Sequence, residues 1–373
     1  MAPVVLELAA RGHGIVNRVC VTGQHREMLD DVLRLFRIRP DHDLDVMQPG
    51  QSPTQVAVEV LRRLEPVLVD ERPDWVIVQG DTTTAATAAL AGFYAGARVA
   101  HVEAGLRSHE SREPFPEEIN RRLAGVIADL HFAPTENARR NLLREGTPAE
   151  SILVTGNPVI DALHQARRLP VPPRSGIADL CRGRRIVTVT AHRRESFGAP
   201  LERICDAVDI LSRRFSDVQV VFPVHPSPAV RAVVDGAFRD NARVTLLEPL
   251  GYRDMVELLE RSCIVLTDSG GLQEEAPSLG KPVLVLRDVT ERQEGVDAGT
   301  VRLVGTDPAN IVDAATSLLT SRREYARMSK AVNPYGDGLA ARRIVGALAG
   351  HAPEEWAGEV PAGSRRGAPL AAL

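Results

Sequence analysis

The sequence contains little lysine, few aromatic residues and no apolar stretch long enough to cross a membrane. Lysine occurs only at Lys281 and Lys330, so nearly all of the 45 basic residues are arginines, and 49 acidic residues balance them. A formal charge of −4 gives no general attraction to nucleic acid or to an anionic membrane. We therefore expect neither a nucleic-acid partner nor a membrane partner.

Motifs for metals and common cofactors are also lacking. The four cysteines form no C-x-x-C pair, and H-E-x-x-H, Walker and G-x-S-x-G sequences do not occur. One near-match to a dinucleotide loop, G-H-G-I-V-N from Gly12, lacks the third glycine and a preceding strand. We expect no metal and no cofactor. We interpret the four thiols as reduced. Since Met1–Ala10 also lacks the features of a signal peptide, we expect a cytoplasmic protein.

Short apolar runs alternate with helical patterns along the chain, which predicts an α/β fold with parallel sheets covered by helices. A length of 373 residues accommodates two domains. The expected strands are Arg18–Thr22, Trp75–Val78, Val99–Val102, Leu130–Ala133, Ile186–Thr190, Val218–Pro223, Ile264–Thr267, Val283–Leu286 and Val301–Leu303.

Composition marks two breaks in this pattern. The Pro-rich stretch Leu169–Ser175 connects the two halves, and we place the hinge between about Gly156 and Gly183. From about His351 the chain is rich in Ala, Gly, Pro and Arg, so residues 351–373 are expected to be disordered.

The run from Cys263 to Leu286 is the most informative segment. After the strand Ile264–Thr267, Ser269, Gly270 and Gly271 are expected to form a tight turn before a helix over Leu272–Leu279. Free N–H groups at a helix start favour an anion, and the acids Glu274 and Glu275 one turn later could accept hydrogen bonds from sugar hydroxyls. This predicts a diphosphate next to a ribose; the alternative is an ordinary strand–turn–helix.

Polar residues follow five of the expected strands, in both halves of the chain: Asp81, Glu103, His192, His225 and Ser269. Ligands of open α/β sheets bind outside the carboxyl ends of the strands. The pattern therefore predicts two facing domains with one cleft between them.

Each acid of the first half also has a purely structural interpretation. Asp81 could cap a helix, Glu103 could form a salt bridge with Arg107, and Glu117 could complement a helix dipole.

The same holds in the second half. His192 with Arg193 and Arg194 could bind phosphate and transfer a proton, or form a solvated charge run. His225 could be a hydrogen-bonded loop residue, and Arg292 could meet either a phosphate or an acidic neighbour.

Longer motifs point to a family. The sequences H-V-E-A-G-L-R-S, F-P-E-E-I-N-R, H-R-R-E-S-F-G, T-D-S-G-G-L-Q-E-E-A-P-S-L-G-K-P and N-P-Y-G-D-G closely resemble those of the non-hydrolysing UDP-N-acetylglucosamine 2-epimerases. The resemblance implies a GT-B fold, in which two Rossmann-like domains face each other across a cleft. It also implies interconversion of UDP-N-acetylglucosamine and UDP-N-acetylmannosamine, with a UDP-sugar as the substrate and a homodimer as the expected assembly.

The resemblance also implies roles for individual residues. Its catalytic set is Asp81, Glu103, Glu117 and His192. Its substrate-binding set comprises the diphosphate loop, the ribose-binding acid and three arginines: Ser269, Gly270, Gly271, Glu275, Arg193, Arg194 and Arg292.

Two departures from the family pattern are present. Gln24, Arg194 and His225 lie near positions that some bacterial members use for a second, activating substrate molecule, but Glu27 and Glu59 stand where those members carry Gln and Arg. This argues against activation. Family members also usually begin with a strand and a G-T-R-P-E loop before M-A-P-V-V, so we expect the central strand of the first sheet to be missing from this sequence.

The expected division is a first domain over residues 1–160, joined by a C-terminal helix over 340–350, and a UDP-binding domain over 161–339. The expected reaction eliminates UDP to give a 2-acetamidoglucal and adds UDP back to it. Two alternatives stay open: a hydrolysing epimerase that releases UDP and N-acetylmannosamine, and an inactive nucleotide-sugar-binding protein.

Overall fold

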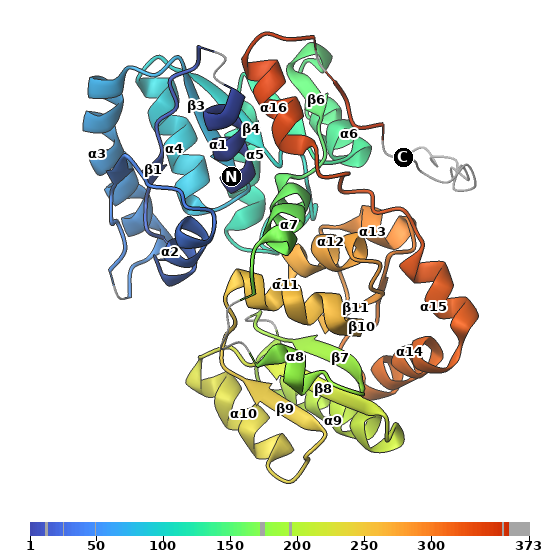
Figure 1. The fold of residues 1–373 in the computed structure, drawn as a ribbon. Helices are drawn as coiled ribbons and strands as arrows, with labels where there is room; N and C mark the ends of the chain where they lie inside the picture. Colours follow the sequence, from blue (N-terminus) through green and yellow to red (C-terminus); the bar gives the residue numbers. More distant parts are fainter. Residues whose placement is uncertain are drawn as a thin grey trace, which may run out of the picture.

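The chain folds into two α/β halves, each built around parallel strands (Figure 1). The computed structural model describes residues 1–11, 14–24, 26–48, 50–171, 176–193, 196–352 and 354–357, with only the backbone of Arg11 and Glu27. Most of the predicted Pro-rich connection, residues 172–175, lies outside the described residues. Within the described ranges no helix has both the length and the apolar composition needed to span a membrane.

The described residues of the first half form thirteen helices and strands. They are α1 (Ala2–Arg11), β1 (Cys20–Val21), α2 (Arg26–Leu35), β2 (His42–Asp43), α3 (Pro53–Glu71), β3 (Trp75–Gln79), α4 (Thr83–Tyr94), β4 (Arg98–Val102), α5 (Glu117–Ile127), β5 (Leu130–Ala133), α6 (Glu136–Arg144), β6 (Ile152–Val154) and α7 (Pro158–Arg168). A 3-10 turn, Ala149–Ser151, precedes β6.

The second half follows the same alternation. Its elements are α8 (Ile177–Leu180), β7 (Arg185–Thr190), α9 (Ala199–Arg214), β8 (Val218–Pro223), α10 (Pro228–Phe238), β9 (Val244–Leu247), α11 (Tyr252–Arg261), β10 (Ser262–Thr267), α12 (Gly270–Ser278), β11 (Val283–Val285), α13 (Gln293–Asp297), β12 (Val301–Leu303), α14 (Pro308–Thr320), α15 (Arg322–Ser329) and α16 (Ala340–Leu348).

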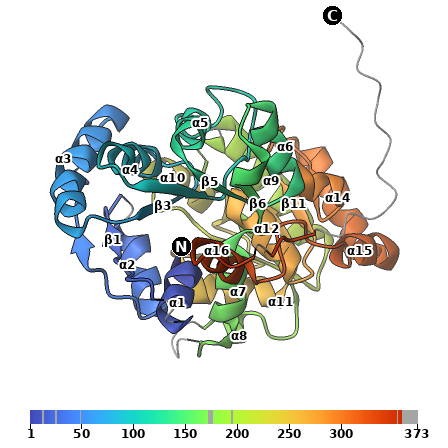
Figure 2. The ribbon, with the colours of Figure 1, turned by 90° about the horizontal axis from the view of Figure 1, so that it is seen from above.

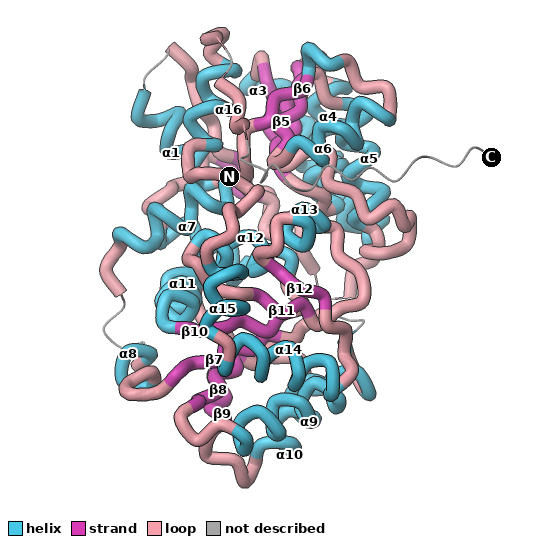
Figure 3. The backbone as a smooth tube through the Cα atoms, turned by 90° about the vertical axis from the view of Figure 1, so that its right-hand side faces the viewer, coloured by secondary structure: helices cyan, strands magenta, loops and turns pink. Residues whose placement is uncertain are grey.

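The second-half sheet has the order β12-β11-β10-β7-β8-β9, and all of its strands are parallel. This is a doubly wound order whose direction of growth reverses between β7 and β10, where ligands of such sheets usually bind. Alternate residues of β7 face opposite layers: Val187 and Val189 pack with α9, whereas Ile186 packs with α8 and α11. Figure 3 shows the strands between these helical layers.

The first-half strands form two separate sheets. The larger has the parallel order β3-β4-β5-β6, and the smaller pairs β1 with β2. Among the described strands, no hydrogen-bonded ladder joins β1 to β3.

The end of the chain returns to the first half. Ile344 and Val345 of α16 pack with Val4 and Leu8 of α1 against β4 and β5, and Figure 2 shows α16 beside α1 and α7. The disorder expected from His351 does not hold for residues 354–357, because Trp356 donates main-chain and indole hydrogen bonds to the carbonyl groups of Val154 and Pro334. Residues 358–373 of the predicted tail lie outside the described residues.

All nine predicted strands are present, with ends that differ by at most two residues. The sequence reasoning missed β2, β6 and β9, which are short, at two to four residues each. The prediction of a turn over Ser269–Gly271 before the helix is wrong. The helix α12 already begins at Gly270, so both glycines lie in its first turn.

Candidate active site

The carboxyl ends of β4 and β5 meet the second half through direct side-chain contacts. Glu103 Oε1 lies 3.6 Å from Arg292 Nη2. Thr135, which caps α6, donates a hydrogen bond from Oγ1 to Glu294 Oε1 at 2.6 Å. Residues more than 150 positions apart in sequence therefore line one junction between the halves, as the strand-end pattern predicted.

Asp81 does not cap α4, because the neighbouring residue Thr82 does. The N-cap of α4 is Thr82, whose side chain accepts a hydrogen bond from Ala85 N, so the capping interpretation of Asp81 is wrong. Buried His101 contacts the carbonyl oxygen of Gly80 through Nε2 at 2.8 Å and so fixes this loop. Burial lowers the pKa of His101 to about 3, which keeps the imidazole neutral. The carboxylate of Asp81 accepts a hydrogen bond from Arg121.

Glu103 directly follows β4 and has a positive φ of 63°, a costly conformation for a residue other than glycine. Its side chain is 14% exposed, and Gln79 donates to Oε2 at 3.2 Å. The predicted alternative, a salt bridge with Arg107, is wrong: Arg107 forms a bidentate pair with Glu145 instead. The strained backbone places the Glu103 carboxylate between the two halves.

Glu117 is the first residue of α5, so its charge does complement the helix dipole. Among the described residues, however, its buried Oε2 atom has no hydrogen-bond partner. The next residue, Glu118, is also buried but accepts from Ser108 N and from Arg122. Because buried carboxylate oxygens are normally hydrogen-bonded, Glu117 has an acceptor available for a ligand.

His192 is oriented by Asp268, which follows β10. Asp268 Oδ2 accepts from the main-chain N–H groups of His192 and Arg193, both at 2.8 Å, and from Ser196 Oγ at 2.9 Å. Its Oδ1 lies 3.1 Å from His192 Nδ1. Burial opposes ionisation of Asp268, but the His192 imidazole and these N–H groups bring its pKa below the usual value. Pairing at Nδ1 directs Nε2 of His192 away from Asp268 and leaves it free to bind a substrate or transfer a proton.

The start of α12 leaves room for Arg292. A methyl group at Gly270 would lie 2.7 Å from the guanidinium group of Arg292, whereas one at Gly271 would have its nearest neighbour at 4.0 Å. Ser269 makes no side-chain capping bond. The first N–H groups of the helix and Arg292 therefore lie together, as an anion site requires.

Arg292 is buried among three acids, so the predicted acidic neighbours are present, and a contact with phosphate stays a prediction. Nε donates to Glu274 at 3.0 Å, Nη1 binds Glu291, and Nη2 faces Glu103. Burial raises the pKa of Glu274, and Arg292 partly offsets this effect. Asn157 of the first half also donates to Glu274, at 2.6 Å. The cation is thus held between the halves.

Glu291 gathers the other arginines of the site. It lies 3.4 Å from Arg193 and 3.0 Å from Arg287. Burial opposes its ionisation, but the guanidinium groups of Arg292, Arg287 and Arg193 hold the pKa of Glu291 well below its usual range. The predicted substrate-binding residues Arg193 and Arg292 thus share one carboxylate. Arg194 lies outside the described residues.

Glu275 lies on α12, one turn after the glycines, and is buried. The Tyr252 hydroxyl donates to its Oε1 at 2.6 Å. Burial raises the pKa of Glu275 to about 7. A carboxylate that changes charge near neutral pH therefore stands beside the predicted anion site.

The two possible allosteric residues lie in different halves. Gln24 Oε1 accepts from the Thr84 hydroxyl at 2.6 Å, three positions after Asp81 in sequence. The ring of His225 stacks on His192 with centroids 6.3 Å apart. Glu59 is held by Arg62 and Arg63 within α3.

Three residues with clear positioning contacts were not predicted: Arg121, Asp268 and Glu291. Two had a usable signal. Asp268 directly follows a strand, as the predicted residues do, and Arg121 stands four positions after Glu117, which places both on one face of a helix. Glu291 had none, because its partners come from distant parts of the chain.

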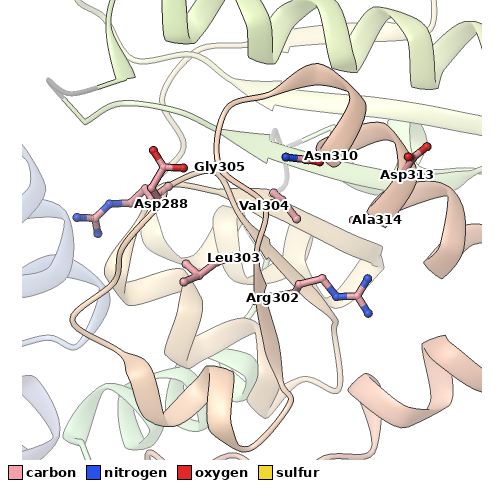
Figure 4. Close-up of a pocket in the computed structure, with 9 residues that line it drawn as sticks. Asp288, Arg302, Leu303, Val304, Gly305, Asn310, Asp313 and Ala314 are labelled. Carbon is pink, nitrogen blue, oxygen red and sulfur yellow. The ribbon is translucent and has the colours of Figure 1, made fainter.

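A hollow of about 400 Å³, lined in part by Arg287, lies beside the ends of β11 and β12 and the start of α14 (Figure 4). Its charged side chains, among them Asp288, Arg302 and Asp313, point in different directions. It contains none of the predicted site residues. In the described part of the chain, no group of three or more His, Cys, Asp or Glu side chains is arranged to hold a metal ion.

Comparison with known proteins gives a consistent family. A family model described as UDP-N-acetylglucosamine 2-epimerase matches residues 8–349. A UDP-N-acetylglucosamine 2-epimerase of Yersinia pestis is 52% identical over 358 residues, which cover 94% of this chain and 95% of that protein.

Solved structures agree. The UDP-GlcNAc 2-epimerase of Neisseria meningitidis bound to UDP-GlcNAc gives a TM-score of 0.88 at 44% identity, covering 93% of this chain and 95% of that one. The Methanocaldococcus jannaschii enzyme in complex with UDP-GlcNAc and UDP gives 0.81 at 32% identity, with coverage of 93% and 95%. The predicted GT-B fold and the family resemblance are confirmed. This chain belongs to the UDP-N-acetylglucosamine 2-epimerase family.

Proposed function

We propose that this protein interconverts UDP-N-acetylglucosamine and UDP-N-acetylmannosamine by eliminating UDP and adding it back. The observation that carries the proposal is the junction of Glu103 with Arg292, 3.6 Å apart. It brings a set of carboxylates from the first half against a set of cations and helix N–H groups from the second. The first set suits proton transfer, and the second suits a diphosphate leaving group.

The ligand class follows from the relatives and from the site. The N. meningitidis relative binds UDP-GlcNAc. In this chain the start of α12 with Arg193 and Arg292 would hold the diphosphate, and Glu275 would accept hydrogen bonds from the ribose. The UDP moiety would thus be bound chiefly by the second half.

The sugar C2–H is not acidic by itself, because no carbonyl is adjacent on the ring. In the first step a base takes the C2 proton, the C1–C2 double bond forms, and the C1–O bond to UDP breaks. In the second step a UDP oxygen bonds to C1 while an acid delivers a proton to C2 on the opposite face. The two steps together are redox-neutral, so the reaction consumes no oxidant or reductant.

The chain provides acids and bases on two sides of the sugar. Proton transfer at C2 would fall to Asp81, Glu103 and Glu117. His192 would contact the diphosphate, or a proton on the diphosphate oxygen that leaves C1. Groups of this kind contribute roughly 10²–10⁴-fold each. Residues 1–160 with α16, and residues 161–339, would act as two domains that close to retain the glycal and UDP.

Turnover in D₂O tests the reaction. The expected product is UDP-N-acetylmannosamine with deuterium at C2, without added NAD or metal. Retention of the original hydrogen at C2 would contradict elimination with solvent exchange. Accumulation of UDP and free N-acetylmannosamine would identify a hydrolysing epimerase, and UDP binding without turnover would identify an inactive binding protein.

A homodimer through α5 is part of the proposal. Ile119, Leu123 and Val126 recur at helical spacing and are exposed, Val126 by 86%. Phe93 and Tyr94 at the end of the adjacent α4 are exposed as well. A second copy would cover this apolar face. Sedimentation should show a dimer for the wild type and a monomer for Leu123→Glu; a monomeric wild type would contradict the assignment.

A further inference from the structure

One buried guanidinium contacts two of the proposed catalytic acids. Arg121 lies on α5, and its side chain is 3% exposed. Its Nη2 atom donates to Asp81 Oδ2, and its Nη1 atom donates to the main-chain oxygen of Glu103 at 3.0 Å. The same Nη1 lies 3.7 Å from Glu103 Oε1. Arg121 therefore links the ends of β3 and β4 to the helix that begins with Glu117.

The contact to Glu103 falls where the backbone is strained. A residue with a side chain held at a φ of 63° needs support from its surroundings. The bond from Arg121 to the Glu103 carbonyl supplies such support, since it ties the peptide group to a rigid helix. The direction of the Glu103 carboxylate depends on that peptide group.

Charge gives a second reason for the arrangement. Asp81 and Glu103 come from adjacent strands and approach the same side of the sheet. Two carboxylates at close range repel each other, and a cation between them offsets this repulsion by attracting both. Arg is suited to this position because its planar fork can donate to two partners at once.

The spacing on α5 divides the helix by function. Glu117 and Arg121 are four residues apart and therefore share a face. Arg122 points elsewhere: its side chain is 40% exposed and pairs with Glu118. Adjacent arginines of one helix thus have different surroundings, which supplies a matched control.

We propose that Arg121 is a positioning residue that sets the geometry of Asp81 and Glu103 for proton transfer at the sugar. The proposal rests on the proposed function. Arg121 itself does not contact the reacting atoms. Its removal should therefore reduce turnover while UDP, bound by the second half, keeps its affinity.

The test compares Arg121→Ala, Arg121→Lys and the control Arg122→Ala. For Arg121→Ala we expect kcat to fall about 10²-fold, the usual consequence of misplacing a reacting group by about 1 Å. The KM and the calorimetric Kd for UDP should change little. Arg121→Lys keeps the charge but not the fork, so its kcat should be intermediate. Arg122→Ala should keep a kcat near that of the wild type, although it should lower stability by removing a partner of buried Glu118.

Added guanidinium ion distinguishes positioning from general stability. At concentrations that do not unfold the protein, it should restore part of the kcat of Arg121→Ala by entering the vacated space. Without guanidinium, a kcat of Arg121→Ala near that of the wild type would overturn the proposal. So would a loss of kcat matched by a loss of UDP affinity, without rescue by guanidinium. If Arg121→Ala does not fold, Arg121→Lys decides by the same comparison of kcat with UDP affinity.

A crystal structure of the variant gives a readout that does not depend on turnover. In Arg121→Ala, or in Arg121→Lys if that variant alone folds, we expect Glu103 to leave the positive-φ region or the Asp81 carboxylate to turn. Unchanged positions of both would overturn the inference. A wild-type protein that forms no epimer would instead refute the proposed function, so the two failures are distinguishable.

Discussion

The two faces of the site are held together in different ways. On the first-half face, Asp81, Glu103 and Glu117 come from three separate elements. Arg121 contacts Asp81 and Glu103, and Glu117 Oε2 has no hydrogen-bond partner among the described residues. On the second-half face, most residues come from one segment between Asp268 and Arg292 and already neutralise one another. The first face has acceptors in reserve, and the second has a dense network of fixed charges.

This difference indicates a division of labour. Carboxylates at such a junction can take up and release protons, whereas a network of arginines with a helix start is organised for a stationary anion. Changes on the first face should therefore alter kcat, and changes on the second face should alter ligand affinity. The predictions below test that separation.

The largest expected effect is on turnover. Asp81→Asn, Glu103→Gln and Glu117→Gln should each lower kcat by roughly 10²–10⁴-fold, because an amide cannot exchange a proton in the same way. Calorimetry should show nearly unchanged affinity for UDP. If one of the three variants retains a kcat near that of the wild type, the substituted acid has a structural role. It would then not count among the proton-transfer residues of the first-half face.

Most of the candidate residues came from strand ends, which the sequence predicted well. Apolar runs located Val99–Val102 and Ile264–Thr267, and they pointed to Glu103 and Ser269 as candidates, although Asp268, which directly follows the second run, was overlooked. The roles of Asp81 and Glu117 came from the family motifs, and the structure then removed the capping interpretation of Asp81.

Partners of these residues could not be predicted in the same way. Arg292 meets Glu103 only after both halves have folded, and these residues are far apart in sequence. The structural alternative for Glu103 was a salt bridge with Arg107, but the fold pairs Arg107 with Glu145. Short strands such as β2 were missed because two residues carry no detectable period.

Asp268→Asn crosses the proposed boundary between the faces, because Asp268 contacts His192 within the half that we propose binds the ligand. The amide nitrogen cannot accept the bonds that Oδ2 accepts from His192 N, Arg193 N and Ser196. Loss of a partner that orients a functional histidine typically costs about 10–100-fold, and we expect kcat to fall by that range. Ser196→Ala removes one of these bonds and should have a smaller effect. Equal losses in both variants would argue against orientation by Asp268.

Gly270→Ala and Gly271→Ala test why glycine begins α12. At Gly270 the new methyl group would contact Arg292, so overpacking should cost about 1–3 kcal/mol in the free energy of unfolding. At Gly271 there is room, and the substitution should be neutral or stabilise by about 0.4–1 kcal/mol. Urea unfolding measures both. Equal stability of the two variants would show that Arg292 can move aside without cost.

The smallest expected effect is a pH dependence of UDP affinity that originates at Glu275. Its pKa of about 7 means that a large fraction of the unliganded protein carries the neutral acid at neutral pH. Ribose hydroxyls bind best to the ionised form, so UDP affinity should rise with pH and be about tenfold weaker at pH 6 than well above pH 7. Glu275→Gln keeps the shape without the titration. It therefore measures the contribution of the phosphate groups of UDP, which must be subtracted.

Stability without ligand should respond in the opposite sense. Because the folded-state pKa of Glu275 is raised above its ordinary value of 4.5, its favourable contribution is complete below about pH 4.5 and is lost as pH rises through about 7. The unfolding free energy of the wild type, relative to Glu275→Gln, should therefore decrease over this range while UDP stabilises the wild type increasingly. A difference between wild type and Glu275→Gln that stays constant with pH would show that Glu275 does not titrate there, and the ribose assignment would lose its electrostatic support.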